Sequence, residues 1–276
     1  MNSTLRFLLP AFAGLICIGA ILTAGCVMGP SGNTTVPSPS VTVTMVPGQG
    51  QQNGPSVTML RDMASLDKAY IPVLALTSQN NSAASRKAMD TLLPAWTTFQ
   101  ARYTGHVPAD PLWNTDLETV NMTIRRANIR INEGNLSGAH TELEQVRLTM
   151  LDLRTRNHIT YFIDNLTLFH DPMERIYLAA YNRPLGEVNV PLIAATLPEA
   201  EARWRNVSGG NISADLFDFN QSKVDQIQSL INNESAAIEN LKNAIRSGDN
   251  STIANASVAI RGPFSQLFSA YGTFPS

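Results

Sequence analysis

Apolar residues recur at spacings of three and four along most of the chain after Thr58, and no other feature constrains the fold as strongly. This period matches the turn of an α-helix, about 3.6 residues, whereas β-strands would need apolar and polar residues to alternate. The clearest stretch follows a capping box at 115–118 and carries Leu117, Val120, Ile124, Ala127 and Ile131. The sequence therefore predicts an all-α fold.

The same pattern predicts eight helices. Five are expected at about 58–77, 83–104, 187–206, 219–247 and 250–271. The other three run from Thr115 to a stop at Gly134, from there to Asn157-His158, and on from there through Ala180. Short breaks between several of them favour antiparallel neighbours. The predicted architecture is an antiparallel helical bundle.

A weak internal repeat suggests how the helices are grouped. "LLPAWTTF" from residue 92 resembles "TLPEAEARW" from residue 196, and "GNLSGAH" from 134 falls where "GDNSTIA" from 248 falls. The repeat predicts two tandem four-helix units, at 58–157 and 158–276. One continuous eight-helix body is the alternative.

The first 26 residues have the features of an export signal. A polar start with one cation, Arg6, precedes an apolar run that ends at Cys26. The residues at 22–26, Leu-Thr-Ala-Gly-Cys, resemble the lipobox of prokaryotic lipoproteins, and this resemblance implies lipid attachment at Cys26. An uncleaved membrane helix is one alternative, because residues 7–28 reach the roughly 20 apolar residues that span a bilayer. An ordinary cleaved signal peptide is another.

Residues 27–57 are rich in Pro, Gly, Ser and Thr and contain no charged side chain. Such a segment cannot build a core, so we expect a disordered tether. Because Arg6 precedes the apolar run, the N-terminus is expected in the cytoplasm. The folded part would then lie on the extracytoplasmic face of the cell membrane, held there by the lipid or the helix.

Acceptor sequences for N-glycosylation agree with an exterior location. They occur after Cys26 at Asn33, Asn80, Asn121, Asn135, Asn165, Asn206, Asn211, Asn220, Asn233, Asn250 and Asn255. The order of lipobox, Ser/Thr/Pro stalk and folded domain is similar to that of glycosylated surface proteins of methanogenic archaea. This resemblance covers about the first 57 residues and implies a location without implying an activity.

Two histidines each precede a glutamate by four residues: His140 with Glu144, and His170 with Glu174. Residues four apart lie on one side of a helix, and imidazole and carboxylate together suit a divalent metal such as zinc or iron. The two helices are consecutive, so the pairs could form one metal site. The alternative is an ordinary solvated helix edge with salt bridges.

Arg147 and Arg154 follow His140 at intervals of seven residues and could form a basic stripe for an anionic ligand. The segment from 139 to 176 also resembles one that recurs in exported helical proteins of unknown activity. That resemblance draws attention to five residues without deciding their role: His140, Glu144, Asp164, His170 and Glu174.

Other motifs are missing from the sequence. It has no Gly-rich phosphate loop, no Cys-x-x-Cys-His for covalent haem and no nucleophile elbow. The balance of 22 acidic against 20 basic residues gives no support for nucleic-acid binding. We therefore expect a membrane-tethered, extracytoplasmic helical protein for binding or surface architecture, with no evident enzymatic activity. A metal-binding or anion-binding bundle is the alternative.

Overall fold

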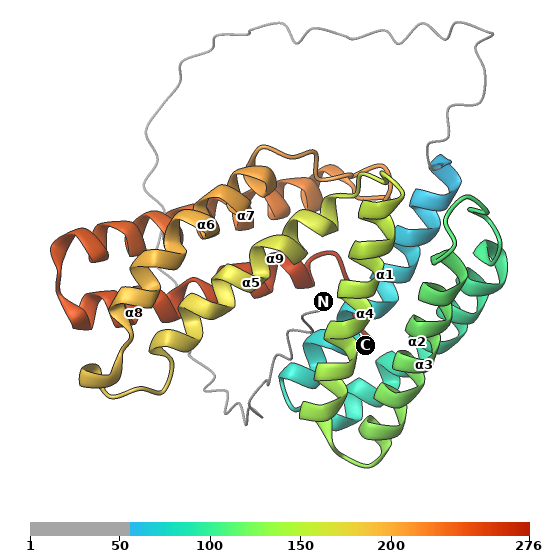
Figure 1. The fold of residues 1–276 in the computed structure, drawn as a ribbon, viewed down its shortest axis with the longest axis horizontal. Coiled ribbons are helices and arrows are strands. Elements are labelled where there is room, and N and C mark those ends of the chain that lie inside the picture. Colours follow the sequence, from blue (N-terminus) through green and yellow to red (C-terminus); the bar gives the residue numbers. More distant parts are fainter. Residues whose placement is uncertain (1–55) are drawn as a thin grey trace, which may run out of the picture. The chain divides into compact units, whose positions relative to one another are not determined.

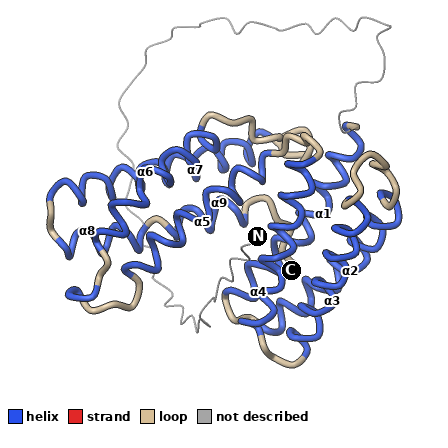
Figure 2. Tube along the Cα trace, viewed as in Figure 1, coloured by secondary structure: helices blue, strands red, loops and turns tan. Residues whose placement is uncertain are grey.

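A computed structural model of the protein describes residues 56–276, and every regular element in this range is a helix (Figures 1 and 2). The elements are α1 (Val57–Ser78), α2 (Ser82–Tyr103), α3 (Trp113–Asn132), α4 (Leu136–Arg156), α5 (Phe162–Ala180), the 3-10 turn η1 (Leu185–Glu187), α6 (Val190–Ser208), α7 (Gln221–Ser247), α8 (Asn250–Ala259) and α9 (Arg261–Ser269). The all-α prediction is confirmed. Cys26, Asn33 and the signal and tether predictions for 1–55 lie outside the described residues.

The clearest differences from the predicted helices are at 250–271 and before residue 115. The helix expected at 250–271 is two helices, α8 and α9, which meet at Ile260. Pro263 explains the break, because it has no N–H to donate to the carbonyl of Ala259 and its ring would clash with that carbonyl. The helix expected from 115 begins at Trp113, whose indole is buried and donates a hydrogen bond of 2.7 Å to the carbonyl of Tyr103. The predicted capping box therefore lies inside α3 and does not start it.

The helices pack mainly as antiparallel neighbours in sequence. α1 pairs with α2, α3 with α4, and α5 with α6, while α7 packs against α8 and α9. Contacts of α4 with α5 and of α1 with α9 join the first four helices to the rest, and a single apolar core runs through both groups. Residues 55–276 thus form one compact unit. That 58–157 and 158–276 are separate folding units stays a prediction. No helix in this described part is long and apolar enough to cross a membrane.

The C-terminal end of the chain is fixed to a proline inside α1. Pro72 has no N–H, so it leaves the carbonyl of Lys68 without its helical donor. The backbone N–H of Thr273 donates to that carbonyl at 2.8 Å. Gly272 permits the approach, because a Cβ there would lie 2.9 Å from the Cδ of Pro72 and 2.9 Å from the Cγ2 of Ile71. The residues after α9 therefore attach the second group of helices, α5 to α9, to α1 in the first group.

Candidate functional site

Charged side chains are buried where α4 meets α5 and α1. Arg154 near the end of α4 is 3% exposed, and its Nε donates to both carboxylate oxygens of Asp164 on α5, at 3.0 and 2.9 Å. Its guanidinium also lies 4.9 Å from the ring centre of Tyr161. The hydroxyl of Tyr161 donates to Asp67 of α1 at 2.7 Å. Burial raises the pKa of Asp67 to about 6, although Arg154 opposes the shift.

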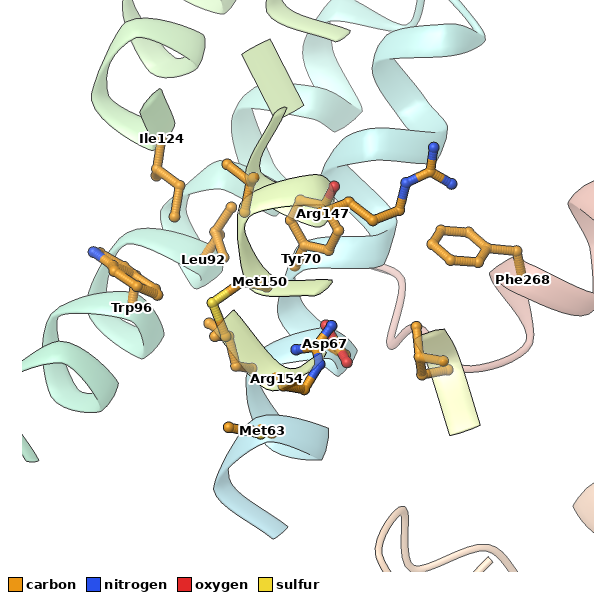
Figure 3. Close-up of a pocket in the computed structure, with 13 residues that line it drawn as sticks. Met63, Asp67, Tyr70, Leu92, Trp96, Ile124, Arg147, Met150, Arg154 and Phe268 are labelled. Atoms are coloured by element: carbon orange, nitrogen blue, oxygen red, sulfur yellow. The ribbon is translucent and has the colours of Figure 1, made fainter. Parts of the chain in front are cut away.

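A small cavity lies beside these groups. It has a volume of about 20 Å³, and Asp67, Tyr70, Arg147 and Arg154 contribute the polar part of its lining (Figure 3). The remaining walls are apolar. A space of this size holds about one water molecule. Nε of Arg147 is buried and has no hydrogen-bond partner, so a water in this cavity would have a donor to accept from.

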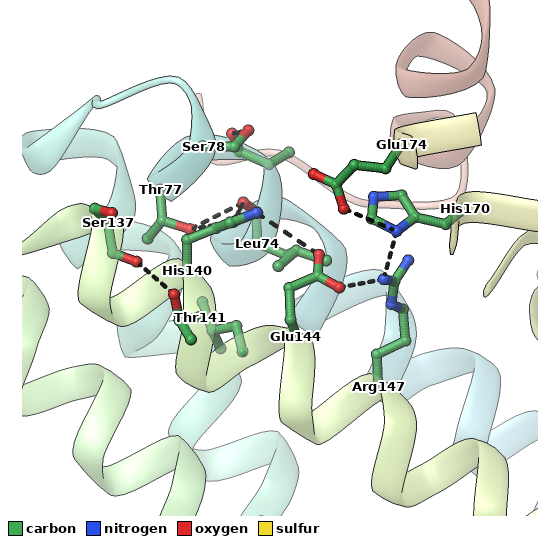
Figure 4. A network of polar contacts seen from close by, with 12 residues as sticks. Leu74, Thr77, Ser78, Ser137, His140, Thr141, Glu144, Arg147, His170 and Glu174 are labelled. Carbon is green, nitrogen blue, oxygen red and sulfur yellow. Dashed lines mark hydrogen bonds and ion pairs between the residues drawn. The ribbon is translucent and has the colours of Figure 1, made fainter. Parts of the chain in front are cut away.

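The predicted histidine pairs meet nearer the N-terminal end of α4. His140, Glu144 and Arg147 face His170 and Glu174 of α5 across a gap (Figure 4). Nε2 of His140 lies 3.6 Å from Oε1 of Glu144, and Nδ1 of His170 lies 3.8 Å from Oε2 of Glu174. Arg147 links the pairs: its Nη2 donates to Oε2 of Glu144 and lies 2.9 Å from Nδ1 of His170. We call these five residues the junction cluster.

His140 has a defined proton position when its ring is neutral. Nδ1 lies 3.1 Å from the carbonyl oxygen of Leu74 and 3.4 Å from the hydroxyl of Thr77, which is itself bonded to backbone carbonyls of α1. A carbonyl can only accept, so Nδ1 carries the hydrogen and Nε2 carries a lone pair. Burial lowers the pKa of His140, although Glu144 opposes the shift. The neutral ring is therefore favoured, and its lone pair faces a carboxylate.

Arg147 determines the protonation states of His170 and Glu144. A guanidinium only donates, so Nδ1 of His170 accepts from it and this ring is also neutral. Burial and the positive charge of Arg147 lower the pKa of His170 to about 3. Burial alone would raise the pKa of Glu144, but the positive charge of Arg147 and its hydrogen bond bring it below its ordinary value. Glu144 is thus ionised, and both rings beside it are uncharged.

These positions correct two expectations. The flank of α4 is not a solvated helix edge, because Arg147 is 6% and Arg154 3% exposed. It is also not an open basic stripe, since Arg147 is paired with Glu144 and Arg154 with Asp164.

The four-ligand metal site is not present as predicted. Among residues 56–276, no three His, Cys, Asp or Glu side chains are grouped so that they could hold a metal ion. The structure does bring His140, Glu144, His170 and Glu174 into one cluster, but Arg147 lies among them. The hydrogen bond from Arg147 to Nδ1 of His170 occupies the lone pair with which this histidine would bind a metal ion shared with Glu174.

Two further carboxyl groups, one half-buried and one fully buried, were not predicted from the sequence. Asp67 stands at helical spacing between the buried residues Met63 and Ile71, and Glu234 stands between Ile227 and Ile238. Glu234 is 0% exposed and neither of its carboxylate oxygens has a hydrogen-bond partner. Burial raises its pKa to about 9. An acidic residue at a core position of the helical period was the signal that could have found both.

No protein-family model, curated protein or solved structure matches the chain. Any role for the junction cluster therefore has to be argued from its own geometry.

Proposed function

We propose that this protein is a lipid-anchored module on the extracytoplasmic face of a cell membrane, where its helical body serves binding or surface architecture. The lipobox-like sequence that ends at Cys26 carries this proposal. The predicted tether, shortened to 27–55 because Ser56 caps α1, would hold the body away from the bilayer. The proposal assigns no reaction, because we recognise no catalytic motif in the sequence.

The positions of the acceptor asparagines support an exterior location. Apart from Asn33, all of those predicted lie in the described part of the chain, and none of them is buried. Asn121 and Asn165 are half-buried, and the others are exposed. A glycan attached to the amide nitrogen of an exposed asparagine can extend into solvent without unfolding a helix. The helical body could thus carry glycans at these positions.

The decisive experiment replaces Cys26 by Ser and follows partitioning between detergent and water phases. The unaltered protein should enter the detergent phase and show the mass of a chain that begins at a lipid-modified Cys26. The variant should move to the aqueous phase or accumulate as the unprocessed precursor. Cys17→Ser is the matched control, because Cys17 lies inside the apolar run and should leave with the signal. Unchanged partitioning and mass in the Cys26 variant would rule out the lipid anchor, and a full-length N-terminus would indicate a retained helix.

A further inference from the structure

We propose that His140 and Glu144 form the preset part of a site for one divalent transition-metal ion of the zinc class, and that Glu174 completes it from α5. The proposal names a ligand for the binding module and so rests on that function. It differs from the four-ligand site expected from the sequence. His170 and Arg147 hold the ligands in position and do not themselves bind the ion.

The spacing of the first two ligand atoms fits a shared ion. Two ligands bound tetrahedrally to zinc at about 2.0–2.1 Å lie roughly 3.4 Å apart. Nε2 of His140 and Oε1 of Glu144 are 3.6 Å apart. Because both residues lie on α4, one turn apart, the helix itself sets this separation. Little rearrangement is needed for these two groups to share an ion.

Both ligand atoms are oriented by outer contacts, as is usual around protein-bound metals. The Nδ1 hydrogen of His140 points to the carbonyl of Leu74, which leaves Nε2 free to coordinate. Arg147 binds Oε2 of Glu144 and leaves Oε1 on the side of His140. The lone pair of a neutral imidazole and a carboxylate oxygen thus face each other. Neither can donate a hydrogen bond, so a cation between them would satisfy both.

Glu174 supplies a third oxygen ligand from the opposite side of the gap. Its side chain is 45% exposed and points towards the space between His140 and His170 (Figure 4). Glu144 lies 3.6 Å from Nε2 of His140 and Glu174 lies 3.8 Å from Nδ1 of His170, and Arg147 donates to Glu144. In the structure Glu174 is not grouped with His140 and Glu144, so this half-exposed side chain has to turn towards the ion to become the third ligand.

His170 is a positioning residue in this arrangement. Arg147 donates to its Nδ1 at 2.9 Å, so that lone pair is not available to a metal. His170 in turn keeps the guanidinium of Arg147 against Glu144. With one ligand from α5 and two from α4, ion binding would tie together the two groups of helices.

The test uses the full-length protein, purified without a histidine tag in detergent and stripped of metal with a chelator. Calorimetric titration with Zn²⁺ should show one ion per chain, whereas Mg²⁺, which demands octahedral oxygen ligation, should give no measurable binding. Replacing His140 by Ala should weaken zinc binding by more than the roughly 10- to 100-fold that loss of an outer-shell partner costs. Glu174→Gln should weaken it at least about 10-fold. His106→Ala is the matched control, since His106 is exposed and remote in sequence from the cluster, and it should bind as the unaltered protein does.

Glu174→Gln keeps the test decisive if His140→Ala fails to fold, because this half-exposed side chain contributes little to the core. The absence of zinc binding by the unaltered protein would overturn the proposal. It would equally be overturned if Glu174→Gln bound zinc normally, or if His170→Ala abolished binding while His140→Ala did not. None of these results depends on the lipid anchor, which the Cys26 variant tests separately.

Discussion

Replacing Glu234 by Gln should stabilise the protein at neutral pH. Glu234 lies in the core between α7 and α9, and burial raises its pKa from 4.5 to about 9. The backbone N–H of Phe264 in α9 offsets the shift only in part, and neither carboxylate oxygen of Glu234 has a hydrogen-bond partner. At pH 7 the carboxyl is therefore ionised in the unfolded chain and neutral in the folded one. Folding has to take up a proton.

The cost of that proton follows from the two pKa values. Each pH unit above the unfolded value of 4.5 removes about 1 kcal/mol of stability, so the total at pH 7 is about 3 kcal/mol. The loss continues as pH rises towards about 9, where the folded protein also ionises. Below pH 4.5 the carboxyl is protonated in both states, and folding takes up no proton. Gln has a similar shape and needs no proton, but it buries an amide whose unmet hydrogen bonds cost about 1 kcal/mol or more.

The assay is chemical unfolding of the full-length protein and the Glu234→Gln variant at pH 5, 7 and 8.5, with linear extrapolation of the free energy. The advantage of the variant should be near zero or negative at pH 5 and should grow by about 1 kcal/mol per pH unit. Glu239→Gln is the control, since Glu239 is exposed on the same helix and should show almost no effect at any pH. A difference between Glu234→Gln and the unaltered protein that does not change with pH would refute the reasoning.

Two further substitutions test how the groups of helices are joined. Arg154→Met should cost about 3 to 5 kcal/mol of unfolding free energy, because it leaves Asp164 buried without its partner, and adding Asp164→Leu should recover part of that loss. Unfolding curves for the single and double variants would show this, and equal stabilities would contradict it. Gly272→Ala should lower stability by about 1 to 3 kcal/mol, because the new Cβ crowds α1. Thermal unfolding compares this variant with the control Gly262→Ala, which should lose less stability because a Cβ at Gly262 meets nothing within 4 Å. Equal losses of stability would count against a close contact between Gly272 and α1.

Most helices could be predicted because their signals are local. The period of three and four residues is read within a few turns, and asparagine caps such as Asn135 and Asn220 stand directly before their helices. The errors arose where a distant contact or a proline intervened. Trp113 starts α3 early because its indole reaches the carbonyl of Tyr103, and Pro263 divides the last expected helix.

The candidate site was predictable in part for the same reason. Helical geometry alone places Glu144 one turn from His140, and Glu174 one turn from His170. The burial of Arg147 and Arg154 was not predictable, because it depends on α5 and α1 lying against that flank of α4. The same holds for Asp67, which meets Tyr161 only after the two groups of helices pack.

The sequence by itself thus determined the helical class, most helix boundaries and the pairing of each histidine with its glutamate, because each depends on residues within about one helical turn. Only the tertiary structure decided which polar side chains are buried and which ring nitrogen of each histidine carries the proton. It also decided that Arg147 lies between the two histidine–glutamate pairs. These properties depend on desolvation and on partners from other helices, and residues far apart in the chain supply both.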